Sequence, residues 1–325
     1  MKAYWTAAAA AMMLLGVAAP VGLGVAGADA AAACQGDPLP STTVAAEPVR
    51  TGFHFTEGPT WVADGGYLLF SDMRDASGPQ AVQPSNIWRF TPPSTFEEFI
   101  PNAGSNGLAV TADGARIVAA THDQQNVSSY ALTDRSRSVL AANFEGHHFN
   151  SPNDVTIAAD GTVYFTDPNF QRGNRADELG GVTGVYRVRD GVVSLVDGTV
   201  NQPNGIALAP DGKTLYVGGL GNNEIFAYAI STDGSVGPRR AFAPLTSPDG
   251  VGIDCAGNLY WASYNEGRVH VISPDGPTIG TITASRNVTN VAFGGSDGQT
   301  IFLTSGTGAN WGIYSAHLNL AGNPY

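Results

Sequence analysis

The chain has 325 residues, with 16 Lys and Arg against 28 Asp and Glu, which gives a net charge of −12 at pH 7. Proteins that bind nucleic acid rely on clustered Lys and Arg, so this balance argues against a nucleic-acid partner and against an anionic membrane surface. The 41 Gly and 20 Pro residues favour many tight turns over long helices, because both residue types break helices and supply turn dihedrals.

The N-terminal segment carries the pattern of an export signal. Lys2 is followed by an apolar, alanine-rich run that ends in small residues at 28–33, which is typical of a secretory signal peptide. We therefore expect residues 1–33 to be a signal peptide and residues 34–325 to form the mature protein, secreted or periplasmic and not associated with a membrane. Since Lys2 is the only charge before the apolar run, an uncleaved membrane anchor is the alternative.

The chain contains two cysteines, Cys34 and Cys255, and both lie outside the expected signal peptide. An exported protein can keep a disulfide that ties its N-terminal tail to a distant strand, so we expect the two cysteines to be paired. Two unrelated thiols are one alternative, and a lipid attached to Cys34 is another. The lipid is disfavoured because Ala31, three residues earlier, is smaller than the aliphatic residue of a lipoprotein signal.

One phrase returns six times along the chain: an apolar-alternating run, a turn usually written Asp-Gly, and a second alternating run. The copies begin at Glu57 (EGPTWVADGGYLLFSD), Ser105, Ser151, Gln202, Ser247 and Asn287. Around the turn Asp160-Gly161, for example, Val155 and Ile157 alternate before it and Val163 and Phe165 alternate after it. Such period-two runs around a turn predict a β-hairpin with one buried face.

Further strand-like runs between the hairpins, such as SNIWRF and EIFAYAI, bring each repeat to about four strands. Six units of roughly 45 residues, each a four-stranded antiparallel sheet, predict an all-β fold, a six-bladed β-propeller. We expect the ring to close by pairing segment 42–50 (TTVAAEPVR) with segment 311–318 (WGIYSAHL). A two-domain β-sandwich is the alternative.

Every repeat has an oxygen-bearing side chain seven residues before the first residue of its turn. We call these six the register residues: Glu57, Asn106, Asn153, Asn204, Asp249 and Asn290. Equivalent positions of successive propeller blades lie on a ring around the central axis, so the six side chains are expected to converge. Two carboxylates and several amides, without Cys or His, favour a hard divalent cation, Ca²⁺ above all, with Mg²⁺, Mn²⁺ or Zn²⁺ as alternatives.

A simpler interpretation is that these Asn and Asp residues cap turns, because both types tolerate unusual dihedrals and bond their own backbone. Glu57 has no such turn preference, and all six repeats carry an oxygen donor in the same register. The pattern therefore favours a metal site over simple capping.

Several short motifs also follow one another in a fixed order. They are EGP at 57–59, SPNDV at 151–155, FTDP at 165–168, PNGIA at 203–207, PDG at 248–250 and TNVAFGG at 289–295. Together, over about Val44 to Leu318, they resemble the SMP-30/gluconolactonase/LRE-like family. The resemblance implies a six-bladed propeller with one catalytic divalent cation, commonly calcium, that hydrolyses lactones such as gluconolactone. It also implies which side chains hold the cation: Glu57, Asn153, Asn204 and Asp249.

One position departs from the family pattern. Many members carry an Arg two residues before the first metal-binding Asn, where it contacts sugar hydroxyls or a carboxylate, but this chain has Ser151 there. The departure leaves the preferred substrate open. Ser151, Asn106, Asp154 and His148 are our candidate substrate-binding residues. For His148, in the stretch GHHFN, a solvent-facing loop position is the alternative.

The segment 169–181 (NFQRGNRADELGG) is polar and too long for a plain hairpin turn. We expect it to form a lid over the site, with a disordered surface loop as the alternative. As part of a lid, Arg172 or Arg175 would supply the anion contact that Ser151 lacks.

These residues together predict a metal-dependent carboxylic ester hydrolase. A divalent cation polarises a lactone carbonyl and acidifies water, so no nucleophilic side chain is required. Asp249 is the candidate general base, both by the family analogy and because a carboxylate within hydrogen-bond reach takes up the proton. Asp154 is a second candidate for the base, or a group that orients Asn153. The sequence contains no G-x-S-x-G elbow, H-E-x-x-H motif or phosphate loop.

We expect a small-molecule lactone or ester as substrate and no obligate protein partner. Two other functions stay open. Phosphotriester hydrolysis uses the same metal chemistry, and a non-catalytic propeller would bind a sugar or a protein and keep the metal as a brace. The intact Glu57 and Asp249 argue against the non-catalytic function, because a retired site is expected to lose ligands.

Overall fold

The computed structural model describes residue 1 and residues 34–323, so the expected signal peptide over residues 1–33 lies, apart from Met1, outside the described residues. The described part is built almost wholly of strands, with two short 3₁₀ turns, η1 (His122–Gln124) and η2 (Leu220–Asn222). None of its helices has the length and apolar character needed to cross a bilayer.

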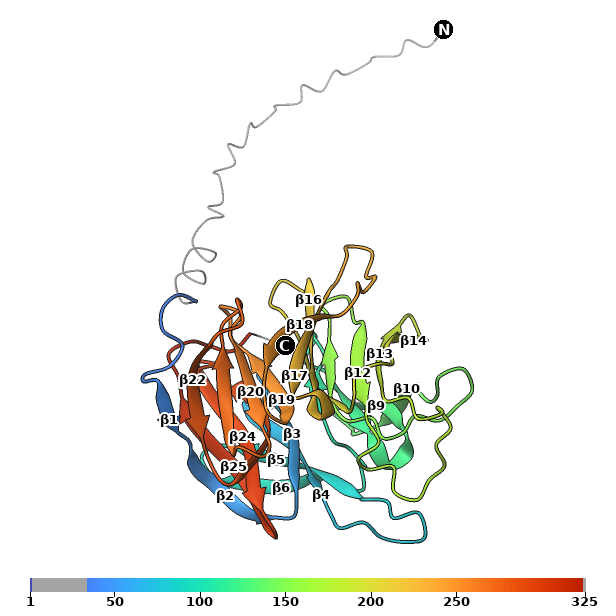
Figure 1. Ribbon diagram of the computed structural model, residues 1–325, viewed down its shortest axis with the longest axis horizontal. Helices are drawn as coiled ribbons and strands as arrows, with labels where there is room; N and C mark the ends of the chain where they lie inside the picture. The colour runs from blue at the N-terminus through green and yellow to red at the C-terminus, as the bar shows by residue number, and fades with distance from the viewer. Residues whose placement is uncertain (2–33, 324–325) are drawn as a thin grey trace. The chain divides into compact units, whose positions relative to one another are not determined.

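The strands of this part form six sheets that stand around a common centre as propeller blades (Figure 1). Blade 1 contains β3 (Thr56–Val62), β4 (Tyr67–Met73), β5 (Ser85–Thr91) and β6 (Thr95–Ile100). Blade 2 contains β7 (Leu108–Val110), β8 (Arg116–Thr121), β9 (Asn126–Ala131) and β10 (Arg137–Ala141). Blade 3 contains β11 (Val155–Ile157), β12 (Val163–Asp167), β13 (Gly184–Arg189) and β14 (Val192–Asp197).

The second half of the ring repeats this arrangement. Blade 4 contains β15 (Pro203–Leu208), β16 (Thr214–Gly219), β17 (Glu224–Ala229) and β18 (Arg240–Pro244). Blade 5 contains β19 (Pro248–Ile253), β20 (Leu259–Ser263), β21 (Arg268–Ile272) and β22 (Thr278–Thr283). Blade 6 contains β23 (Asn287–Gly294), β24 (Thr300–Thr307), β25 (Asn310–His317) and the early strand β2 (Glu47–Phe53). The predicted all-β, six-bladed propeller with four antiparallel strands per blade is confirmed.

The ring closes in two steps. Strand β2 pairs antiparallel with β25, with Glu47 opposite Ser315, so the last blade contains both an early and a late part of the chain. Strand β1 (Thr43–Ala45) instead pairs in parallel with β22 and adds a fifth strand to blade 5. The predicted closing segment 42–50 is therefore divided between two blades.

The Asp-Gly turns form as their chemistry requires. In the turn between β11 and β12, Asp160 Oδ1 accepts a hydrogen bond from the Thr162 N–H at 3.0 Å. Gly161 has φ +84°, a left-handed conformation that glycine adopts without the steric cost of a side chain. Each hairpin thus turns tightly enough to keep its two strands paired.

The apolar core lies between neighbouring blades. One cluster joins Val62 and Leu69 of blade 1 to Ile117 of blade 2, and another joins Ile225 of blade 4 to Trp261 of blade 5. Because each blade buries both of its faces against neighbours, the strands alternate less strictly than in an open sheet. The core thereby holds the blades in a fixed radial arrangement.

The innermost strands β3, β7, β11, β15, β19 and β23 contact one another in turn around the axis. We call the end of the axis where these strands terminate in hairpin turns the turn-side end. The opposite end, where they begin, is the lid-side end, because segment 169–181 follows β12 there. The two ends present different residues, and the candidate site lies toward the lid side.

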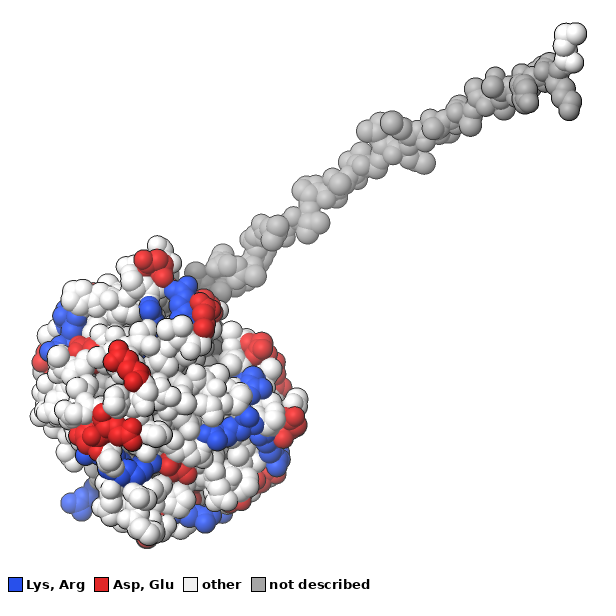
Figure 2. Space-filling view, turned by 90° about the vertical axis from the view of Figure 1, so that its right-hand side faces the viewer, with Lys and Arg blue, Asp and Glu red and all other residues white. Residues whose placement is uncertain are grey.

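On the face drawn in Figure 2, Lys and Arg side chains are interspersed with Asp and Glu side chains, with uncharged residues between them. This face carries no continuous basic surface of the kind that tracks a phosphate backbone.

Cys34 and Cys255 form a disulfide that spans 221 positions of sequence and ties the N-terminal segment to the hairpin of blade 5. A cross-link across so long a segment restricts the unfolded chain strongly. We expect the double variant Cys34→Ser, Cys255→Ser to lose about 2–5 kcal/mol of unfolding free energy. Thermal unfolding would show this as a lower Tm, and reduced wild-type protein should match the variant. If thiol titration proves that reduction is complete and Tm is unchanged, the expectation is contradicted.

Candidate active site

The register residues lie at the beginning of the inner strands. Four of them fall within strands, Glu57 in β3, Asn204 in β15, Asp249 in β19 and Asn290 in β23. The other two, Asn106 and Asn153, stand two residues before β7 and β11. All six side chains are buried, with exposed fractions between 1% and 6%. Polar groups buried this deeply require partners, so their contacts report what the site can hold.

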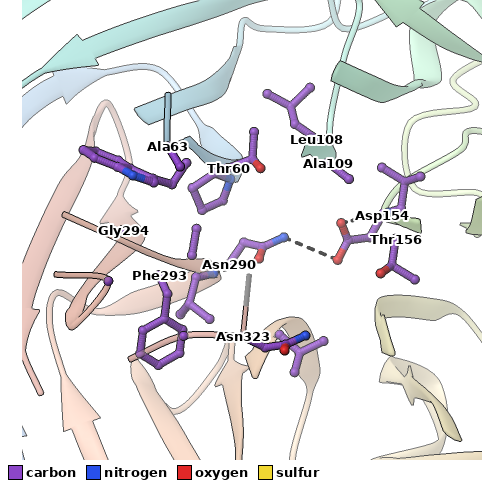
Figure 3. Close-up of a pocket in the computed structure, with 18 of the residues that line it drawn as sticks. Thr60, Ala63, Leu108, Ala109, Asp154, Thr156, Asn290, Phe293, Gly294 and Asn323 are labelled. Carbon is purple, nitrogen blue, oxygen red and sulfur yellow. Dashed lines mark hydrogen bonds between the residues drawn. The ribbon is translucent and has the colours of Figure 1, made fainter. Parts of the chain in front are cut away.

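The side chains converge on the axis, as the repeat register predicts. Asn290 Nδ2 of blade 6 donates a long hydrogen bond of 3.5 Å to Asp154 Oδ2 of blade 3, directly across the ring (Figure 3). The Asp249 carboxyl of blade 5 accepts a hydrogen bond from the Asn204 side chain of blade 4. Glu57 of blade 1 lies close enough for its charge to act on Asp249. Side chains of five blades therefore meet at one place.

Asn153 is positioned through its backbone. Its N–H donates to Thr166 O at 2.8 Å, and its carbonyl accepts from the Gly107 N–H at 2.7 Å. Thr166 also donates from Oγ1 to Asn204 O at 2.8 Å, which links blade 3 to blade 4. Adjacent blades thus hold one another's register residues in place.

Glycine makes this convergence possible. A glycine directly follows four register residues, at positions 58, 107, 205 and 250. A Cβ added at Gly58 would lie 2.2 Å from Asn106 O, and one at Gly205 would lie 2.1 Å from Asp249 O, distances that atoms do not adopt. The repeated glycine is visible in the sequence, and it is the signal that would have predicted the close approach of neighbouring inner strands.

Three buried carboxyl groups share the axis. Burial, followed by the charge of Asp154, raises the pKa of Glu57 to about 8. Burial raises the pKa of Asp154 to about 7. Burial, together with the charges of Glu57 and Asp154, raises the pKa of Asp249 well above its usual range. Without a counter-charge, these groups resist joint ionisation, and a divalent cation is the kind of group that relieves such repulsion.

One atom of the site has no protein partner. Asp249 Oδ1 is buried and accepts no hydrogen bond from the described residues. A buried acceptor left unpaired costs about 1–3 kcal/mol, and a bound cation would satisfy it. The described residues contain no group of three or more His, Cys, Asp or Glu side chains suited to a metal, so a cation held here has to use amide oxygens as well. The predicted ligands fit a hard cation on these grounds: Glu57, Asn153, Asn204 and Asp249.

The predicted substrate-binding residues lie in two places. Asn106 and Asp154 lie at the axis, and Asn106 Nδ2 is buried without a protein partner. Ser151 contacts the start of the lid instead, because its Oγ donates to Pro168 O at 2.6 Å and accepts from the Gln171 N–H at 3.2 Å. A direct role of these residues toward substrate stays a prediction.

His148 is exposed, and its Nδ1 lies 2.9 Å from Glu178 Oε1 in the lid. Its N–H also donates to Glu178 Oε2 at 2.9 Å. His148 therefore anchors the lid in this structure.

The lid reaches from blade 3 toward blades 1 and 2. The Asn174 N–H donates to Gln80 O at 2.8 Å, in the loop between β4 and β5. Arg175 donates to His122 O at 3.0 Å and to Asp123 O at 2.8 Å. These bonds span three blades, so the segment bridges the lid-side end rather than extending into solvent.

The two arginines of the lid are occupied by protein groups. Arg175 donates to Gln171 O and Arg172 O in addition to its contacts with blade 2, so carbonyl oxygens surround its guanidinium. Arg172 Nη1 donates to Asn150 Oδ1 at 3.0 Å and pairs with Asp177 at 3.1 Å. In this arrangement both side chains fasten the lid.

Asp167, in the motif FTDP, was not a predicted site residue, yet it aligns Asn153. Its buried carboxylate accepts hydrogen bonds from the N–H of Asn150 at 2.9 Å and of Ser151 at 2.8 Å. It also accepts from Asn150 Nδ2 at 3.1 Å. These donors stand three and two residues before Asn153, so Asp167 fixes the backbone that leads to a predicted ligand.

Asp72 repeats this arrangement in blade 1. Its Oδ1 accepts from the N–H of His54 at 2.8 Å and of Phe55 at 3.1 Å, three and two residues before Glu57. Asp72 and Asp167 both lie near the end of the second strand of a hairpin, in the motifs FSD and FTD. This shared position is the sequence signal that would have identified both residues.

We expect Asp167→Asn to weaken divalent-cation binding by about 10–100-fold, as is typical when a group that orients a ligand is lost. An amide has one acceptor oxygen, and its NH₂ group would face the backbone donors that the carboxylate now accepts. Calorimetric titration with Ca²⁺ measures the effect. Asp160→Asn, in an exposed turn that Asn also suits, is the matched control. A folded Asp167→Asn protein with wild-type Ca²⁺ affinity would show that the hydrogen bonds of Asp167 do not position the site.

The raised carboxyl pKa values predict a pH-dependent stability of the metal-free protein. Glu57 holds its proton to about pH 8 in the folded state but loses it near 4.5 when unfolded, so the folded state binds more protons between these values. Stability is then full at low pH and falls as the pH rises through this window. In chelator, Tm should fall from about pH 5 to about pH 9, and Ca²⁺ should restore it. The decrease of Tm with pH should be smaller in the Glu57→Gln variant. An equal decrease in both proteins would contradict the prediction.

Comparisons with known proteins agree with this architecture. The chain is 32% identical over 293 residues to the gluconolactonase of Zymomonas mobilis, covering 80% of this chain and 78% of that protein. It is 27% identical to a pentonolactonase of Haloferax volcanii, covering 80% and 84%. A solved structure of a gluconolactonase from Xanthomonas campestris matches with a TM-score of 0.72 at 29% identity, covering 83% of this chain and 88% of that chain.

The family model for the SMP-30/Gluconolactonase/LRE-like region matches residues 55–307, a span that contains all six register residues. The motifs that suggested a resemblance lie within or beside this span. The chain therefore belongs to the SMP-30/gluconolactonase/LRE-like family.

Proposed function

We propose that the protein is an exported, divalent-cation-dependent hydrolase that opens a sugar lactone at the lid-side end of its axis. The observation that carries the proposal is the unpartnered, buried Asp249 Oδ1 among carboxyl and amide groups of five blades. The names of the relatives support the reaction, since they are a gluconolactonase and a pentonolactonase. A sugar lactone is the substrate class common to both names.

The cation would be held by Glu57, Asn153, Asn204 and Asp249, with Ca²⁺ as the preferred metal because all the donors are hard oxygens. When bound, a divalent cation polarises the lactone carbonyl and lowers the pKa of water. The chain itself then has to supply a base, a donor for the substrate and a means of limiting solvent.

Asp249 is the base in this proposal. As a carboxylate beside the cation, Asp249 would lie within hydrogen-bond reach of the attacking water and take up its proton. The water oxygen bonds to the carbonyl carbon, the ring C–O bond breaks, and the ring oxygen takes up a proton. The product is a hydroxy acid, and no other reactant is consumed.

Two further features serve the substrate. Asn106 Nδ2 is a buried donor without a protein acceptor, and a substrate hydroxyl or carbonyl oxygen would satisfy it. The lid, fastened through Asn174 and Arg175, limits access of solvent to the same end of the axis.

An exported location fits two features of the chain. The first 33 residues carry the composition of a signal peptide. The disulfide between Cys34 and Cys255 belongs to the oxidising compartments in which disulfides persist.

We expect the mature protein to hydrolyse D-glucono-1,5-lactone or a pentonolactone, to lose activity in chelator and to regain it with Ca²⁺. Asp249→Asn should lower kcat by about 10²–10⁴-fold, the usual contribution of a general base. A pH-stat assay corrected for spontaneous hydrolysis measures the rates, and Asp211→Asn in an exposed turn is the matched control. Full activity of Asp249→Asn would remove the proposed base. Turnover of phosphotriesters but of no lactone would replace the proposed reaction.

A further inference from the structure

A cavity of about 300 Å³ lies on the turn side of the register residues, and Asn290 and Asp154 form part of its lining. Five inner strands contribute apolar side chains to its walls: Leu108, Val155, Ile206, Val251 and Val291. The lining also contains polar side chains: Thr60, Thr156, Asn290, Ser296 and Asn323. None of the four predicted metal ligands is among its lining residues. The cavity is therefore a second feature of the axis, and its size is that of a small-molecule site.

One charged group faces this cavity. Asp154 is 6% exposed and is the only Lys, Arg, His, Asp or Glu among the lining residues (Figure 3). Its Oδ1 accepts the Val155 N–H at 2.9 Å, the Ile206 N–H is a further backbone donor to the carboxyl group, and its Oδ2 has a long 3.5 Å contact with Asn290. Because a carboxylate can accept about four hydrogen bonds, Asp154 keeps acceptor capacity toward the cavity that it lines.

A second hollow adjoins the cavity between blades 1 and 6. Trp61, Ala63, Gly295 and Ser296 line both the cavity and this hollow of about 760 Å³, so the two spaces share a wall. The Trp61 ring stacks on Phe302 with the ring centroids 5.6 Å apart, which fixes an aromatic surface at the junction. The residues shared by the two spaces mark the junction through which a ligand is expected to reach Asp154.

The C-terminal segment completes the wall. Gly322 and Asn323 line the cavity, and their N–H groups donate to Gly298 O and Ile253 O, both at 2.9 Å. The Cys255 N–H donates to Ala321 O at 2.9 Å, beside the disulfide. The wall is therefore held by backbone hydrogen bonds rather than formed by a loose tail.

We propose that this cavity binds a small organic ammonium ion, with its N–H₃⁺ group on Asp154 Oδ2 and its apolar body against Val155, Ile206, Val251 and Val291. The carboxylate repels anions. A polyol such as a sugar carries hydroxyl groups on every side, and those that face Val155, Ile206, Val251 and Val291 would stay unpaired, which is costly. An ammonium group on an apolar stem satisfies both the single charge and the apolar lining.

The test is calorimetric titration of the mature protein, in saturating Ca²⁺, with phenethylammonium and with two probes of similar shape. The neutral probe is 2-phenylethanol and the anionic probe is phenylacetate. We expect phenethylammonium to bind at one site at least about tenfold more tightly than the alcohol, because only the amine forms a charged hydrogen bond. Phenylacetate should not bind. Equal binding of the amine and the alcohol would overturn the proposal.

Two variants locate the site. Asp154→Asn removes the charge and should weaken phenethylammonium binding by about tenfold or more. Ala63→Trp adds bulk at the junction of the two spaces and should also weaken it. Ala63 is exposed, so this change leaves the core intact and keeps the test valid if the Asp154 variant does not fold. Undiminished binding in a folded Ala63→Trp protein would overturn the proposed path.

Asp249→Asn separates this proposal from the proposed enzyme. It should lose lactone hydrolysis but keep phenethylammonium binding, because Asp249 does not line the cavity. Loss of amine binding in this variant would place the ligand at the lid-side end and overturn the inference. Amine binding that persists in a protein without lactonase activity would sustain it independently of the proposed function.

Discussion

The close approach of six inner strands around one axis is the constraint on which the rest of the structure depends. Glycine permits it, since a Cβ at Gly58 or Gly205 would occupy the space of the next blade's backbone carbonyl. The same approach forces the register side chains out of water and toward one another. Burial of charged carboxyl groups is unfavourable unless a counter-charge compensates them. The close packing of the ring therefore also determines the electrostatics of the site.

Local patterns made the fold predictable, and non-local pairing limited the prediction. The Asp-Gly turns and the period-two runs beside them are complete within each repeat, so hairpins, blade number and register followed from short windows of sequence. The strand pairing that closes the ring cannot be predicted from any such short window of sequence. Strand β1 leaves the expected partner β25 and pairs in parallel with β22, a choice set by a strand more than 230 positions away in sequence.

The site shows the same division. Sequence spacing alone predicted that Glu57 and Asp249 occupy equivalent positions of their blades. In the structure the two carboxyl groups are close enough for the charge of Glu57 to raise the pKa of Asp249. Spacing did not reveal that Ser151 and His148 are engaged by Pro168 and Glu178, because lid contacts depend on how a long segment folds back. Side-chain direction was hidden as well, since Asp154 adjoins Asn153 in sequence but lines the turn-side cavity, whereas Asn153 does not.

Blade 5 carries the proposed base and also receives most of the reinforcement. Strand β1 extends it, the disulfide ends on Cys255 in its hairpin, and the C-terminal segment bonds to that hairpin through Ala321. Without a bound metal, electrostatic repulsion among Glu57, Asp154 and Asp249 destabilises the axis. Part of this repulsion acts on blade 5, because Asp249 belongs to that blade. Functional sites commonly hold such unfavourable arrangements because surrounding structure restrains them. The additional strand and the cross-link therefore reinforce the blade that carries Asp249.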